Sequence, residues 1–310
     1  MKFKYNFKVY APATIANFAV NKNNFSIALQ DLQDEIIVKK STIAGVSISQ
    51  IINNKTKISK AIKENTAAYT AQLIFQHLIE TKQLDTSLGI ELELRKKIPL
   101  SYGLGSSIAS ACGAALATNI AFGNQLDRKE LIPFIHKALV EINKKNRISS
   151  IISCLDGGLV LQSSKLSFEF YRFPLPRGLQ FCLGIPKIKE PAFRSKLAIQ
   201  DKNYTTLESS DAATFTQALY TNNLKLIQQS LKNYYCYPQN NILIALRNKI
   251  YNKEALYFDF INRHTAMFAF CKNTVDAENI AIDFESFYKN YQIKNKVLTS
   301  SINQEGCTAT

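Results

Sequence analysis

The sequence predicts a mixed α+β protein with two domains, and three features of the chain support this. The chain has 310 residues, which is enough for about two domains. Hydrophobic residues make up 46% of it and charged residues 20%, as in ordinary globular proteins. Strand-like and helix-like patterns follow one another along the chain, and the pattern changes near residues 160–170. We therefore expect domains at 1–164 and 165–310.

The first domain is expected to begin with strands and to continue with helices. Short runs of β-branched and aromatic residues between turn residues are typical of strands. Strands are expected at 5–10, 25–30, 34–40 and 43–51. Residues 86–98 alternate leucine and isoleucine with charged side chains, which predicts a half-buried strand. Apolar spacing of helical period predicts helices within 57–81, at 106–121 and at 128–145.

The second half of the chain begins with strands and then alternates between helices and strands. Strands are expected at 157–162, 166–173 and 179–185. Helices are expected at about 210–221, 223–233, 240–252 and 275–290. The remaining strands are expected at 255–260, 265–271 and 293–300.

Cysteine usage and hydropathy indicate a cytoplasmic protein. The six cysteines are widely spaced and include no CxxC pair, which is typical of reduced thiols rather than of disulfides or a zinc site. No apolar run has the length of a membrane span, so we expect no membrane partner. The N-terminal twenty residues alternate like a strand and lack the apolar core of a signal peptide.

The net charge of +14 raises nucleic acid as an alternative partner. The basic residues are mostly lysines scattered among asparagine and isoleucine, and no stripe of arginine and aromatic residues accompanies them. Compositional drift explains this pattern better, so we expect no nucleic acid partner. The general attraction of basic proteins to phosphate backbones keeps the alternative open.

A tight glycine turn precedes a helix of small residues, within residues 96–119. Pro99 ends the preceding strand, and Gly103 and Gly105 allow backbone angles that other residues resist. Ser106 and Ser107 stand where the helix should begin, and serine is a favoured N-cap. The start of a helix offers free N–H groups and a positive dipole end, which suit a polyphosphate. A capped core helix with close packing is the alternative interpretation.

The complete string "PLSYGLGSSIAS" is more specific than a glycine pair. It resembles the phosphate loop of the GHMP small-molecule kinases, and differs from that pattern at Ile108, where alanine is usual. The string "KVYAPATIANF" near the N-terminus and "SSINQEGCTAT" at the C-terminus resemble the homoserine kinase family, whose members phosphorylate the hydroxyl of L-homoserine with ATP in threonine biosynthesis. The resemblance implies an N-terminal α+β nucleotide-binding domain and a ferredoxin-like α+β C-terminal domain. Members of the family often form dimers, so the resemblance suggests a homodimer.

The resemblance also implies the site residues and the ligands, which are ATP, Mg²⁺ and L-homoserine. The triphosphate would lie against Pro99, Leu100, Ser101, Tyr102, Gly103, Leu104, Gly105, Ser106, Ser107, Ile108 and Ala109. Ser107 would contact Mg²⁺, and Asn65 would help to hold the base. Asn17 and Asn23 would contact the substrate, and Arg194 would act as the catalytic arginine that holds the homoserine carboxylate. From the residues alone, turn or capping roles for Asn17 and Asn65, and a solvated Arg194, stay open.

Several positions depart from the family pattern. Asn23 stands where the family has a substrate-binding Asp, and Leu139 where it has a metal-binding Glu. Glu141 lies two residues beyond that position. Residues 147–150 stand in place of a His-x-Asp-Asn segment, and residues 261–271 stand in place of a glycine-rich loop. Asn240 stands where the family has a second arginine, and the nearby Arg247 could take over the role of that arginine. Two explanations follow. The chain is either a diverged homoserine kinase, or a catalytically degenerate relative that serves as a nucleotide-binding or interaction module.

Overall fold

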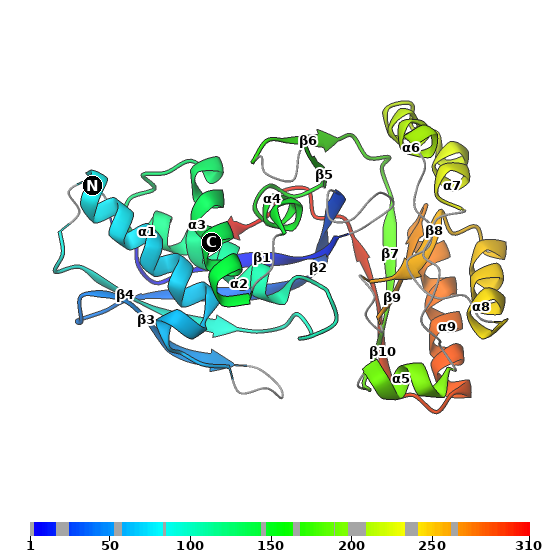
Figure 1. Cartoon of the computed structure of the whole chain (residues 1–310), viewed down its shortest axis with the longest axis horizontal. Coiled ribbons are helices and arrows are strands. Elements are labelled where there is room, and N and C mark those ends of the chain that lie inside the picture. The colour runs from blue at the N-terminus through cyan, green and yellow to red at the C-terminus, as the bar shows by residue number, and fades with distance from the viewer. Residues whose placement is uncertain are drawn as a thin grey trace.

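The structure of the chain is a computed structural model. It describes residues 3–16, 25–52, 58–82, 85–143, 147–163, 168–188, 190–197, 209–232, 241–261 and 266–310. The described strands form two sheets, one in each half of the molecule, and helices pack on both (Figure 1). This arrangement confirms the mixed α+β fold class.

The first sheet is built mainly from the N-terminal half of the chain. Its strands are β1 (Phe7–Ala16), β2 (Phe25–Lys40), β3 (Gly45–Ile52), β4 (Gly89–Arg95), β5 (Leu159–Gln162), β6 (Phe170–Phe173) and β11 (Thr308–Ala309). They lie in the order β11-β1-β2-β4-β3, with β5 paired to the other end of β2 and β6 paired to β5. Strands β3 and β4 are parallel and are connected through helix α1 (Thr66–Lys82). The C-terminal strand β11 therefore returns to the first sheet.

One long strand replaces the two that were expected at 25–30 and 34–40. The polar residues between them suggested a turn, yet β2 continues through them. Its partner β1 absorbs a register shift between Pro12 and Thr14. The polar groups at this point are satisfied from elsewhere in the chain, because the Asp31 N–H donates to Ser300 Oγ, and the Ser301 N–H donates to the Asp31 carboxylate.

Four helices cover one side of the first sheet. They are α1, α2 (Ser106–Ala121), α3 (Arg128–Asn143) and α4 (Ile148–Asp156), and a short 3₁₀ turn at Ile62–Glu64 precedes α1. Helices α2 and α4 pack on β1 and β2, and α3 packs on the other three helices (Figure 1). Helix α2 is almost entirely buried, which its small side chains allow because neighbouring backbones can approach closely. At Gly113 an added Cβ would come within 2.2 Å of Ile36 Cδ1.

The second sheet has the ferredoxin-like arrangement that the sequence resemblance implied. Its strands are β7 (Gln180–Pro186), β8 (Tyr257–Phe260), β9 (Met267–Cys271) and β10 (Asn295–Ser301). They are antiparallel and lie in the order β10-β7-β9-β8. The connections between them carry α5 (Glu190–Lys196), α6 (Ser209–Tyr220), α7 (Leu224–Leu231), α8 (Asn241–Asn252) and α9 (Thr274–Asn290). A βαββαβ chain order gives this topology.

Both faces of the second sheet are buried. On β7, Phe181 and Leu183 belong to the large core that continues from the first sheet, whereas Cys182 belongs to a smaller core beneath α8 and α9. Strand β9 alternates in the same way, with Phe270 on the first face and Ala269 on the second. Because successive side chains of a strand point to opposite faces, one sheet serves both cores. The two halves of the molecule are therefore joined by continuous apolar packing.

Three elements were not predicted from the sequence. Helix α4 has only nine residues, although its apolar residues Ile148, Ile151, Ile152 and Leu155 recur at helical spacing. Helix α5 and strand β11 have seven and two residues, which is too short for a pattern to be recognised. Strand β6, which follows residue 164, pairs within the first sheet, and the proposed domain boundary stays a prediction.

None of the described helices combines the length and hydropathy of a membrane-spanning segment. The five described cysteines are all free and buried, in agreement with the expected reduced thiols. Cys154 and Cys307 approach each other, with their sulfur atoms 3.9 Å apart.

We predict that Gly306→Ala strongly destabilises the protein. Gly306 has a φ of +72°, and an added Cβ would lie 2.0 Å from the backbone oxygen of Leu155. Gly178→Ala is the matched control, because its φ of +83° is similar but its nearest atom lies 3.7 Å away. Both changes carry the left-handed strain of about 1–2 kcal/mol, and Gly306→Ala should lose roughly 2 kcal/mol more. Urea unfolding measures the difference, and equal losses would contradict the assigned clash.

Candidate functional site

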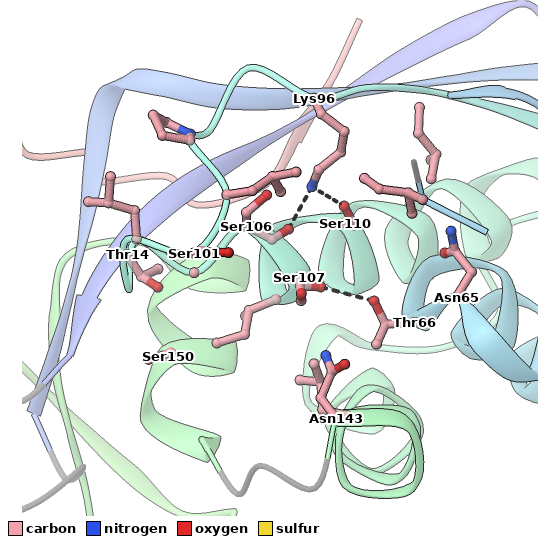
Figure 2. A pocket seen from close by; sticks show the side chains of 18 of the residues that line it. Thr14, Asn65, Thr66, Lys96, Ser101, Ser106, Ser107, Ser110, Asn143 and Ser150 are labelled. Atoms are coloured by element: carbon pink, nitrogen blue, oxygen red, sulfur yellow. Dashed lines mark hydrogen bonds between the residues drawn. The ribbon is translucent and has the colours of Figure 1, made fainter. Parts of the chain in front are cut away.

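The phosphate-loop candidate lines a cavity of about 350 Å³. The cavity lies between the start of α2, the end of β4, the start of α1 and a wall formed by α3 and α4 (Figure 2). Its lining residues from the loop and the start of α2 are Pro99, Leu100, Ser101, Gly103, Leu104, Gly105, Ser106, Ser107 and Ile108. The other predicted loop residues, Tyr102 and Ala109, are not part of the lining.

The loop backbone turns through the left-handed region at three positions. These are Ser101, Gly103 and Gly105, with φ values of 69°, 78° and 76°. At Gly105 an added Cβ would also approach Thr14 Oγ1 to 2.4 Å, so both the backbone angle and the close contact require glycine. Ser101 adopts this angle despite its side chain, which costs about 1–2 kcal/mol. The loop is therefore held in shape by its surroundings.

The expected serine cap is wrong, and the correction matters for the chemistry. Gly105 occupies the N-cap of α2, and no side chain accepts a hydrogen bond from the first turn there. The N–H groups at the start of a helix need acceptors from outside the helix. A bound anion would satisfy them, helped by the positive end of the helix dipole.

Hydroxyl groups add further donors around this helix start. Thr14 Oγ1 and Ser106 Oγ are buried and have no hydrogen-bond partner within the described part of the chain. Thr14 is 2% exposed and Ser106 is 8% exposed. Ser107 is exposed at the cavity, and its carbonyl accepts a 3.4 Å hydrogen bond from Thr66 Oγ1 (Figure 2). Buried hydroxyls without a partner are costly, and a ligand with several acceptor oxygens would satisfy them.

A buried ion pair that the sequence analysis did not identify holds this loop in place. The Lys96 ammonium donates to the Asp34 carboxylate. It also donates to the Ser106 carbonyl at 2.7 Å and to Ser110 Oγ (Figure 2). Asp34 also accepts from the backbone N–H groups of Lys97 and Ile98, at 2.8 and 2.9 Å. Burial lowers the pKa of Lys96, and the Asp34 carboxylate opposes that shift. The pair thus connects β2, the end of β4 and the first turn of α2.

Asn65 lines the cavity, and its side chain caps α1. Its Oδ1 accepts from the N–H groups of Ala67 and Ala68, at 2.9 and 3.2 Å, and its Nδ2 donates to the Ser59 carbonyl at 2.7 Å. The capping role that was left open for this residue is therefore present. Its contact with a nucleotide base stays a prediction.

The wall opposite the loop comes from α3 and α4. It contributes Leu139, Asn143, Arg147 and Ser150 to the cavity. Leu139 is buried at the cavity. Glu141 is exposed and does not line it, and its carboxylate accepts a 2.5 Å hydrogen bond from the Tyr69 hydroxyl, which is the largest cause of the raised pKa of Tyr69. Glu141 therefore does not bring a carboxylate to the cavity lining.

Arg194 and Arg247 do not line this cavity. Arg194 lies on α5, a helix held to the second sheet's core by Phe193 and Leu197. Arg247 stacks on the ring of Tyr251 at 5.3 Å. Asn17, Asn23 and Asn240 lie outside the described residues, as do residues 262–265 of the altered loop. Their roles stay predictions.

The cavity suits a polyphosphate better than a metal ion held by protein carboxylates. In the described part of the chain, no group of three or more His, Cys, Asp or Glu side chains forms a metal site. The described lining carries a single carboxylate, that of Glu64, which is exposed beside Asn65. Mg²⁺ in kinase sites is usually bound by one or two carboxylates together with substrate phosphates. The lining therefore does not fit a protein-held Mg²⁺ centre, and contact of Ser107 with the ion stays a prediction.

The fold and the loop define a class, namely an α+β protein with two sheets and a glycine loop that lines a cavity at the uncapped start of a buried helix. Residues 65–158 match the family described as GHMP kinases N terminal domain. This part of the chain, which holds the loop and helices α1 to α4, is therefore similar to the GHMP kinases.

Relatives that carry the name homoserine kinase match most of the chain. The protein from Chloroherpeton thalassium is 24% identical over 96% of this chain and 97% of its own. The protein from Chlorobium phaeobacteroides is 27% identical over 76% of each chain. The crystal structure of homoserine kinase from Cytophaga hutchinsonii superposes with a TM-score of 0.86, at 24% identity, over 100% of this chain and 99% of that one. The structural likeness establishes the fold over the full length.

We predict that Asp34→Asn destabilises the protein most strongly at neutral pH. An asparagine oxygen can still accept from the Lys97 and Ile98 N–H groups, so the change leaves mainly the buried Lys96 charge without its partner. Such a loss costs about 3–5 kcal/mol. Without Asp34 the pKa of Lys96 falls further, so the folded state binds fewer protons than the unfolded state. Stability then rises with pH, by up to about 1.4 kcal/mol per pH unit.

Urea unfolding at several pH values measures this effect. The double change Asp34→Asn with Lys96→Met removes both charges and should regain most of the lost stability. A deficit that is independent of pH, or a double variant no better than the single one, would contradict the role given to the ion pair.

Proposed function

We propose that the protein is an ATP-dependent kinase that phosphorylates the hydroxyl of L-homoserine, forming O-phosphohomoserine in threonine biosynthesis. The observation that carries the proposal is the loop at the start of α2, with its uncapped helix end and the buried hydroxyls of Thr14 and Ser106. The full-length likeness to relatives named homoserine kinase supports this acceptor over the other substrates of the family. The free cysteines agree with a cytoplasmic location.

The cavity has one end suited to a base and another suited to phosphates. Ile51, Ile58 and Leu94 provide apolar lining, against which a base can bury its faces. In Figure 2, Asn65 and Ser150 lie on either side of the first turn of α2. We place the base on the Asn65 side and the terminal phosphate and acceptor on the Ser150 side.

The reaction requires mainly positioning and charge stabilisation. The helix N–H groups and the hydroxyls of Ser106, Ser107 and Thr14 would hold the phosphate chain. The acceptor hydroxyl oxygen then bonds to the γ-phosphorus while the bond to the bridging oxygen breaks. ADP leaves, and the hydroxyl proton passes to water. The proposed carboxylate contact, Arg194, lies on α5 outside the described lining, so its part in acceptor binding is a separate prediction.

The arrangement of α3 favours a second candidate function. Leu139 lies at the cavity, and Glu141 is bonded to Tyr69 away from it. A chain that retains the phosphate loop but lacks this carboxylate could bind nucleotide without transferring its phosphate. The second candidate is therefore a nucleotide-binding module without catalytic activity.

The test is the release of ADP by purified protein with Mg·ATP, in the presence and absence of L-homoserine. We expect homoserine-dependent release that falls roughly ten- to a hundredfold in Ser107→Ala, because a positioned donor to the phosphates is lost. Ser47→Ala, at an exposed position on β3, is the matched control and should behave as the wild type. Nucleotide binding without homoserine-dependent turnover would contradict the kinase proposal and support the binding module.

A further inference from the structure

The hydroxyl of Thr14 is a polar group that the described part of the fold does not use. Thr14 lies on β1, lines the cavity and is 2% exposed. Its Oγ1 has no hydrogen-bond partner among the described residues. A hydroxyl has one donor and two acceptor sites, and a buried hydroxyl without a partner is costly. Valine would fill the same place in a strand without this cost, so an occupant of the cavity is what can satisfy the hydroxyl.

Contacts with the loop hold Thr14 beside the N-cap of α2. Its backbone N–H donates to the Leu104 carbonyl at 3.1 Å. A Cβ added to Gly105 would come within 2.4 Å of Thr14 Oγ1, so the hydroxyl lies against the residue at which the helix begins. The register of β1 shifts between Pro12 and Thr14, and such irregularities re-aim side chains next to sites. The hydroxyl is therefore placed where the helix N–H groups and the helix dipole attract an anion.

The segments on either side of the start of α2 define an order along the cavity. Thr66, the first residue of α1 and the neighbour of Asn65, donates to the Ser107 carbonyl at 3.4 Å. Thr14 lies instead beside Gly105. In Figure 2, Thr14 and Asn65 likewise lie on opposite sides of the first turn of α2. A phosphate chain that extends from a base near Asn65 thus passes Ser107 first and reaches Thr14 last.

We propose that Thr14 is a specificity-determining residue, whose hydroxyl donates to the terminal phosphate of a bound nucleoside triphosphate. The inference rests on the proposed function, in which the cavity is the nucleotide site. A hydrogen bond from a hydroxyl to a phosphate oxygen is charge-assisted and stronger than a neutral one. A diphosphate bound at the same base position ends before Thr14 and leaves the hydroxyl without a partner. Thr14 therefore favours the nucleotide that still carries the group to be transferred, and it favours release of the diphosphate product.

Titration calorimetry with ADP and with the non-hydrolysable triphosphate AMP-PNP, both in excess Mg²⁺ and without acceptor, tests the proposal. Thr14→Val removes the hydroxyl and keeps the shape of the side chain. We expect the AMP-PNP affinity to fall about tenfold or more, as for a lost hydrogen bond to a charged group, and the ADP affinity to change less than about threefold. Thr14→Ser keeps a hydroxyl and should retain most of the AMP-PNP affinity. An unchanged AMP-PNP affinity in Thr14→Val, or equal losses for both nucleotides, would overturn the proposal.

The stability of the free protein is a second readout, because a binding role and a structural role predict different changes in it. Removal of a buried hydroxyl that has no partner relieves a cost, so the Tm of Thr14→Val without nucleotide should equal or exceed that of the wild type. A fall in this Tm would show that the hydroxyl has a structural partner in the free protein, and would overturn the proposal.

Thr118→Val on α2 is the matched control for both measurements. Thr118 is also buried, but its Oγ1 donates to the Ala114 carbonyl at 2.8 Å, and it is not part of the cavity lining. This change should leave the affinities for AMP-PNP and ADP as in the wild type and should not raise the Tm. A selective loss of AMP-PNP affinity in Thr118→Val as well would overturn the assignment to Thr14.

The two proposals fail in different ways. Absence of homoserine-dependent ADP release, with the selective loss of AMP-PNP affinity in Thr14→Val, contradicts the kinase function and supports the role of Thr14. Homoserine-dependent release by the wild type, with unchanged AMP-PNP affinity in Thr14→Val, leaves the kinase function standing and overturns the role of Thr14. A wild-type chain that does not bind AMP-PNP would also overturn the role of Thr14.

Discussion

The buried ion pair between Asp34 and Lys96 is the interaction on which the site depends. Asp34 lies in the middle of a sixteen-residue strand, and Lys96 follows the end of the neighbouring strand. Their contact, with the Asp34 bonds to the Lys97 and Ile98 N–H groups, sets the direction in which the chain leaves the sheet. Lys96 then bonds to Ser106 and Ser110, so the sheet and the first turn of α2 are held together. The ion pair and these hydrogen bonds thus fix the position of the loop relative to the first sheet.

Asp34 and Lys96 neutralise each other inside the fold, which limits what Lys96 can do at the site. A lysine whose donors already have partners stabilises the loop without offering its charge to a ligand. The groups at the start of α2 that could meet an anion are the uncapped N–H groups and the buried hydroxyls of Thr14 and Ser106. These groups belong to two segments that are distant in the chain, β1 and the start of α2. The second sheet packs against the first half of the molecule, because the large core of the first sheet continues across one face of the second sheet.

Some parts of the site could be predicted from the sequence and others could not. The loop could be predicted because its residues are contiguous, and because Gly103 and Gly105 indicate a turn that needs left-handed backbone angles. The sequence singled out Asn65 but left its role open, and the structure shows that its side chain caps α1. Asp34 and Lys96 were missed because they are sixty-two residues apart and each looks like an ordinary surface charge. The wall formed by α3 and α4 was missed because its lining residues come from two helices, and only the fold brings them opposite the loop.

The sequence by itself determined the mixed α+β class, most of the strands and helices, and the position of the glycine loop before α2. These features depend on local patterns, which are periodicity, glycine spacing and a contiguous motif. Tertiary structure alone decided which residues face the loop. It places Leu139 at the cavity, bonds Glu141 to Tyr69 and pairs Lys96 with Asp34. The physical reason is that burial and charge pairing depend on neighbours that are distant in the chain.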